Sequence, residues 1–303
     1  MQIVFKYGAS ILFLVFGFNG LAQDFELFKI ETAYYPSQTI RESSVDGEVG
    51  FWEWGVQLAI PQPLKNDKTI LIHRVGYVNL RADIRANLLN TDIEETEYYH
   101  SILYNLGIVQ TLNANWKVIL NVSPTLASDF KASLNSDDLL FQASVFAMNS
   151  KSEKLQYGFG LAYNTRFGRQ LATPIGLLQY KTERIDLDMM LPNKLSILYN
   201  THRPFFFGLE ATLNGGLFNN NGEIEAVNIT IDEAGYTRLT LGPILSYTVK
   251  DAFKFYATGG VAAGRRLEFI NTAEEVLDRT PENGSFFRVG FSFNPSPKMK
   301  SKR

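Results

Sequence analysis

Asp186 and Asp188 are the two residues whose types and spacing most directly suggest chemistry. Residues two apart on a β-strand point to the same face, so the two carboxylates are expected side by side. Paired carboxylates bind cations or act as an acid–base pair. A structural ion pair with arginine inside the fold is the alternative, and it is the one that we favour.

The other residue types that carry catalysis or bind metals form no set. The three histidines, His73, His100 and His202, lie in different segments and lack a metal-ligand spacing. His100 is next to Ser101, but adjacent side chains on a strand point in opposite directions, so they do not form a dyad. There is no cysteine, which removes disulfides, thiolate metal sites and a thiol nucleophile. We therefore predict no catalytic residues, no metal site and no cofactor, and a protein that is not an enzyme.

Charged residues also occur on the polar side of segments that are otherwise apolar. On a lipid-facing surface such charges are costly, so we place them in the interior of a barrel. We favour a paired polar network that fills the barrel; the alternative is a lining that selects a solute. The candidates are Glu53, Lys117, Arg166, Asp186, Asp188, Glu210, Arg238, Lys254, Arg266 and Arg288.

The elements that position these charges are predicted by a two-residue period. In 155–167, Leu, Tyr and Phe alternate with small or polar residues, as expected for a strand with one apolar face. The segments 116–127, 205–213, 238–249 and 285–293 repeat the pattern. A soluble β-sandwich also alternates, but this aromatic face would aggregate in water and suits lipid. The sequence thus predicts an all-β fold, a single antiparallel transmembrane β-barrel.

The connections between these segments alternate between long and short. This alternation is typical of barrels with longer outer loops and short periplasmic turns. Keeping it requires Pro192-Asn193 to be a tight outer turn between two short strands. We then expect about 14 strands, with about 12 as the alternative, since the number is even in such barrels. The predicted outer loops are 37–46, 82–96, 128–137, 218–235 and 268–284.

The N-terminus predicts export. Lys6 is followed by an apolar run, Tyr7 to Gly20, of the length of a signal-peptide core, and Ala22 provides a small residue for cleavage near Ala22 or Gln23. We divide the chain into a signal peptide (1–22), an outer-membrane barrel (23–294) and a polar basic tail (295–303). Lys and Arg number 29 against 31 Asp and Glu, which argues against nucleic acid as a partner.

The segment Asp186 to Pro192 (DLDMMLP), the closing Phe286 to Phe293 (FFRVGFSF), the signal peptide and the alternating strands together resemble an uncharacterised family of outer-membrane β-barrels of Bacteroidetes-type Gram-negative bacteria. More remotely, the chain is similar to barrels associated with aromatic-degradation operons, which are proposed to transport hydrophobic compounds. The chain departs from the usual pattern in one respect, because Phe293 is followed by a polar tail instead of ending the chain.

Three functional hypotheses follow. The first is a channel or transporter for small solutes, including hydrophobic ones. The second is a structural or surface-interaction barrel that transports nothing, and the third is an outer-membrane enzyme that acts on lipid or peptide. The expected partners are outer-membrane lipid, the barrel-assembly machinery during biogenesis and a small-molecule solute, and the expected location is the cell outer membrane.

Overall fold

The computed structural model describes residues 26–294 except 42–45, 89–90, 203, 222, 225–228, 251, 272 and 274–275. The predicted signal peptide (1–22) and the basic tail (295–303) lie outside the described residues. The elements are β1 (Phe28–Thr39), β2 (Asp46–Pro63), β3 (Thr69–Leu88), β4 (Thr91–Thr111), β5 (Trp116–Ser128), η2 (Ser136–Asp138), β6 (Leu139–Ser150), β7 (Leu155–Asn164), β8 (Leu171–Lys181), β9 (Ile185–Leu191), β10 (Lys194–His202), β11 (Phe205–Asn219), β12 (Glu223–Ile224), β13 (Ile229–Val249), β14 (Phe253–Asn271), β15 (Val276–Asp278) and β16 (Gly284–Phe293).

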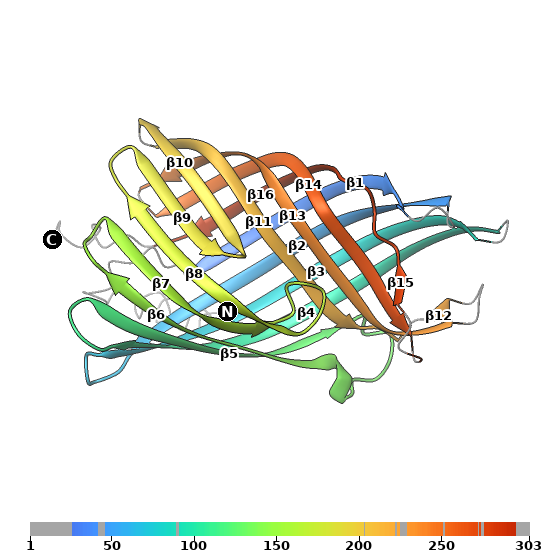
Figure 1. The fold of residues 1–303 in the computed structure, drawn as a ribbon, viewed down its shortest axis with the longest axis horizontal. Helices are drawn as coiled ribbons and strands as arrows, with labels where there is room; N and C mark the ends of the chain where they lie inside the picture. Colours follow the sequence, from blue (N-terminus) through green and yellow to red (C-terminus); the bar gives the residue numbers. More distant parts are fainter. Residues whose placement is uncertain are drawn as a thin grey trace, which may run out of the picture.

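The strands form one antiparallel sheet that closes on itself (Figure 1). β16 pairs with β14 on one side and with β1 on the other, so the last strand of the chain joins the first. Fourteen of the described strands form the barrel wall, while β12 and β15 are short additions to β13 and β14. The tight turn between β9 and β10 at Pro192-Asn193 is present. The prediction of a 14-stranded barrel is confirmed.

Side chains alternate between the outside and the interior of the wall. On β2, Trp52 and Trp54 are exposed, whereas Phe51 is buried. On β16, Phe287 and Val289 are exposed on the outside and Arg288 is buried between them. This apolar outer surface, with the backbone paired around the barrel, is the arrangement that a bilayer permits. No helix among the described residues is long and apolar enough to cross a membrane.

The strands differ greatly in length. β3, β4 and β13 have 20 or 21 residues, whereas β7, β9 and β10 have 10, 7 and 9. The predicted outer loops 82–96 and 218–235 are therefore largely strand, and their interpretation as loops was wrong. In the first of these segments Arg85 bonds to Glu94 across the β3–β4 hairpin at 3.0 Å.

The long strands close over the ends of the short ones. β5 and β11 lie on either side of β6–β10, yet Ser128 at the end of β5 pairs with Asn219 at the end of β11. Beyond this contact the interior is filled by a cluster of buried, mostly apolar side chains, most of them from β1–β5, β11, β13 and β14 and none from β7–β10. We call this cluster the apolar plug; its aromatic members are Tyr35, Phe51, Tyr99, Phe218, Tyr236, Phe269 and Phe286. The opposite end of the barrel, with the short turns, is the short-turn end.

The facing of β5 makes a first prediction. Leu120 is 40% exposed on the outside, whereas Asn121 points inward and donates to Ser144 on β6 at 3.0 Å. In lipid vesicles, Leu120→Arg should lower the free energy of unfolding by about 2–4 kcal/mol, because it places a charge in hydrocarbon. Asn121→Arg is the matched control and should cost much less. Equal losses in urea titrations would contradict the assigned facing.

Candidate functional site: the barrel interior

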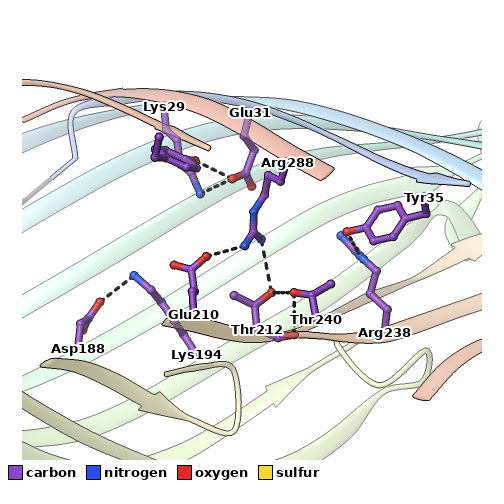
Figure 2. A network of polar contacts seen from close by, with 11 residues as sticks. Lys29, Glu31, Tyr35, Asp188, Lys194, Glu210, Thr212, Arg238, Thr240 and Arg288 are labelled. Atoms are coloured by element: carbon purple, nitrogen blue, oxygen red, sulfur yellow. Dashed lines mark hydrogen bonds and ion pairs between the residues drawn. The ribbon is translucent and has the colours of Figure 1, made fainter. Parts of the chain in front are cut away.

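A buried ion pair inside the barrel joins two strands that are not neighbours in the wall. Arg288 on β16 bonds to the carboxylate of Glu210 on β11 at 2.5 Å, and both side chains are less than 10% exposed. The same guanidinium donates to the hydroxyl of Thr212 at 3.4 Å, and Thr212 in turn bonds to Thr240 on β13 (Figure 2). β13 and β14 separate the two strands in the wall, so the contact spans the inner face of these two strands.

A second buried pair lies closer to the apolar plug. Arg238 on β13 forms an ion pair with Glu53 on β2. Its Nε also donates to the hydroxyl of Tyr35 on β1 at 2.5 Å, and its guanidinium lies 5.0 Å from the centre of that ring. Arg238 thus binds a carboxylate and an aromatic side chain at once, where the polar lining meets the plug.

Lys29 and Glu31 on β1 lie in the same layer of the interior as the Arg288–Glu210 and Arg238–Glu53 pairs, and we call these six side chains the polar layer. Their side chains bond at 2.9 Å, and the hydroxyl of Tyr256 on β14 donates to Glu31 at 2.8 Å. Neither charge was among the sequence candidates, because the facing of 25–35 is ambiguous when read without its neighbours. Pairing with β2 and β16 settles it, since Ala33, two residues further on, is buried in the interior.

The two aspartates that first suggested chemistry are paired with lysines. Asp188 bonds to Lys194 at 2.8 Å and accepts from Gln179 at 3.2 Å, and Asp186 lies 3.6 Å from Lys181. The expectation of arginine partners was wrong, although the structural pairing itself is present. Lys117 and Lys254 also lie towards the short-turn end. Lys117 on β5 is the cross-strand neighbour of the buried Met148, and Lys254 on β14 is that of the buried Ser292.

Arg166 lies beyond the end of β7, in the connection to β8, where it donates to Asn214 on β11 at 2.6 Å. The connection packs closely against β13: Gly168 has a φ of +72°, and a side chain at Gly235 would meet the carbonyl of Gly168. Arg169 also bonds to Glu268 on β14 at 3.4 Å. This connection therefore covers the place where the short strands end.

Arg266 is the candidate that the structure corrects. It is exposed on the outer face of β14, where it lies 3.5 Å from Glu268. Gly264 has a φ of +55°, and the pairing with β13 shifts here by one extra residue on β14. Such a β-bulge reverses the facing of every residue that follows it. Arg265 therefore points inward in place of Arg266, and Gly264 beside the two arginines was the only signal of it in the sequence.

The apolar plug above the polar layer is made of stacked rings. Phe51 and Tyr236 lie 4.4 Å apart, Tyr99 and Phe218 lie 5.2 Å apart, and Tyr35 lies 6.1 Å from Phe286. Offset aromatic pairs at these distances add to the stability that apolar burial provides. The interior therefore changes from charged at the short-turn end to aromatic at the other.

The histidines make ordinary contacts with nearby polar groups. His73 bonds to Tyr104 at 2.8 Å and to Gln62 at 3.1 Å, and His100 bonds to Tyr77 at 2.7 Å and stacks on Phe130. The side chain of His202 lies outside the described part of the structure. No group of three or more His, Cys, Asp or Glu side chains able to hold a metal ion occurs among the described residues.

A family model described as Domain of unknown function (DUF6268) matches residues 28–297, which includes every strand of the barrel. The chain belongs to this family. No match was found among curated proteins.

Several solved structures are similar to this DUF6268 member. The NanC porin is 10% identical, with 88% of this chain and 100% of that chain covered and a TM-score of 0.37. The TodX monoaromatic hydrocarbon channel deltaS2 mutant is 8% identical, covering 88% and 89%, with a TM-score of 0.42. The COG4313 outer membrane channel from Pseudomonas putida F1 is 10% identical, covering 91% and 98%, with a TM-score of 0.39.

The buried ion pair between Arg288 and Glu210 makes a second prediction. Glu210→Leu should lower the free energy of unfolding by about 3–5 kcal/mol, because it leaves the buried charge of Arg288 without its partner. The double variant Glu210→Leu/Arg288→Leu should recover a large part of that loss. Urea unfolding of all four proteins measures the coupling, and strictly additive losses would show that the two side chains do not interact.

Asp138, in the connection from β5 to β6, makes a third prediction. Burial alone would raise the pKa of its carboxyl, but hydrogen bonds from Ser128, Asn219 and the Asn135 backbone N–H lower the pKa below its usual 3.8. The ionised form then stabilises the fold above the unfolded pKa, and this contribution is lost as the pH falls through the lowered folded value. Asp138→Asn should destabilise the protein by about 1–3 kcal/mol at neutral pH. The difference should vanish in strong acid; a loss independent of pH in denaturant titrations would contradict this reasoning.

Proposed function

We propose that this DUF6268 barrel is an outer-membrane channel for small, partly apolar solutes, in a closed conformation. The observation that carries the proposal is the position of the apolar plug, directly above the polar layer around Arg238. Among the described residues the plug is made of side chains of the wall itself. Small movements of these side chains and of the long strands would therefore be enough to open a path.

The chemistry of the interior indicates the class of solute. A solute that crosses the barrel meets ion-paired charges at the short-turn end and then aromatic rings such as Phe51 and Tyr236. Apolar and aromatic surfaces favour solutes with an apolar body, while fixed polar groups orient them. In this proposal the short turns lie in the periplasm, as is usual for such barrels, and the partners are outer-membrane lipid, the assembly machinery during biogenesis and the solute.

The second candidate is a structural or surface-interaction barrel. The tight packing of the plug supports it, since a permanently filled end passes nothing. In that case the long-strand end, with the β3–β4 hairpin and the β11–β13 and β14–β16 connections, would contact a partner (Figure 1). We propose no enzymatic role.

Opening the plug by mutation separates these candidates and makes a fourth prediction. Phe286 is fully buried in the plug, whereas its neighbour Phe287 is 61% exposed on the outside. In planar bilayers, Phe286→Ala should increase the conductance or the fraction of time spent open, because it removes a ring from the closed path. Phe287→Ala is the matched control and should leave the conductance unchanged.

The same variant is expected to lose about 3–5 kcal/mol of stability, the usual cost of a buried Phe→Ala change, so its folding has to be verified by the heat-dependent mobility shift in gels. Liposome swelling with small sugars and aromatic solutes gives a second readout. The proposal fails if neither the wild type nor folded Phe286→Ala passes any solute, and the second candidate then replaces it.

A further inference from the structure

Arg265 is an arginine that the fold places in an apolar environment. The β-bulge at Gly264 directs the side chain of Arg265 from β14 into the interior of the barrel, where it is 1% exposed. Its inward neighbours along the strand, Ala262 and Leu267, belong to the apolar plug. β-Bulges often redirect a side chain next to a functional site. Without the extra residue, Arg265 would lie on the outer face.

The guanidinium of Arg265 lacks the partners that the other buried arginines have. Among the described residues, Nε, Nη1 and Nη2 have no hydrogen-bond acceptor. The guanidinium lies over the rings of Phe51, at 5.0 Å, and Tyr35, at 6.0 Å. The hydroxyl of Tyr236 lies close enough to the guanidinium to interact with it, although no full hydrogen bond joins the two. Glu53, the carboxylate whose charge acts on Arg265, is already paired with Arg238.

Burying an unpaired charge is costly, so an anion that pairs with this guanidinium would be stabilised by the hydrogen bonds and the charge that the fold leaves unmatched. A guanidinium presents a planar fork of donors that fits a carboxylate with two parallel hydrogen bonds. The rings of Phe51, Tyr35 and Tyr236 provide apolar contacts around that fork. The combination fits a molecule with one carboxylate on an apolar body.

We propose that Arg265 binds the carboxylate of an amphipathic organic anion at the boundary between the polar layer and the apolar plug. This inference rests on the proposed channel function and names its class of solute. A cavity of about 40 Å³ lies beside Glu53 and Arg238, with room for only a few water molecules, and Arg265 is not among its lining residues. The rings therefore have to separate to admit the solute, so binding at Arg265 and opening of the plug are coupled.

The test is binding to the purified full chain in detergent, measured by calorimetry with benzoate and with benzamide, its neutral analogue of the same shape. The wild type should bind benzoate about tenfold or more tightly than benzamide, as expected for a charge-assisted bidentate pair. Arg265→Met keeps the length of the side chain but removes the fork, and should abolish the preference. Arg266→Met, a change at the exposed next residue, is the matched control and should keep it.

Two results would overturn the inference: a wild type that binds benzoate no better than benzamide, or an Arg265→Met protein that retains the preference. Should Arg265→Met fail to fold, Arg265→Lys replaces it, since lysine keeps the charge and lacks the planar fork. A benzoate affinity at least threefold weaker supports the proposal, and an unchanged affinity overturns it.

Flux of benzoate into liposomes distinguishes this inference from the channel function itself. Binding that depends on Arg265 without flux through the wild type or Phe286→Ala contradicts the channel and leaves the binding site in place. Flux that shows no dependence on Arg265 contradicts the binding site and leaves the channel.

Discussion

Every backbone N–H and C=O group in a bilayer has to find a partner within the protein, and the rest of this structure depends on that constraint. The pairing of β16 with both β1 and β14 meets it, because it leaves no open edge in the sheet. Once the sheet is closed, alternate residues have to face either lipid or the interior. The apolar outer surface and the charged interior are consequences of the same closure.

Unequal strand lengths then divide the interior into two environments. Where all fourteen wall strands are present, the interior holds charges that pair between non-neighbouring strands, such as Arg288 with Glu210. Beyond the ends of the short strands, the contact of Ser128 with Asn219 brings the long strands together, and rings fill the narrower space. Arg238 binds a residue of each environment, Glu53 and Tyr35, and so joins the two. A path through the barrel would be controlled at this boundary.

The sequence predicted the class of fold and the number of strands, because period-two alternation reports locally which side of a strand meets lipid. It failed where the information is not local. The long ends of β3 and β4 were predicted as an outer loop, whereas they are paired strands whose charges meet across the hairpin, as Arg85 does with Glu94. Arg265 and Arg266 were exchanged, because one extra residue at Gly264 reverses the alternation and only the pairing with β13 reveals it.

The central claim is that β14 has one face in lipid and one in the interior, with a reversal at Gly264. The chain contains no cysteine, so single cysteines can be placed from 257 to 268 and spin-labelled in vesicles. Accessibility to oxygen, which dissolves in lipid, should be high at 257 and 261 and low at 258 and 262. After the reversal it should be low at 265 and 267. Accessibility to the water-soluble nickel reagent should be low at the interior positions 258, 262, 265 and 267. An uninterrupted alternation through 264, or equal accessibility at neighbouring positions, would contradict the account.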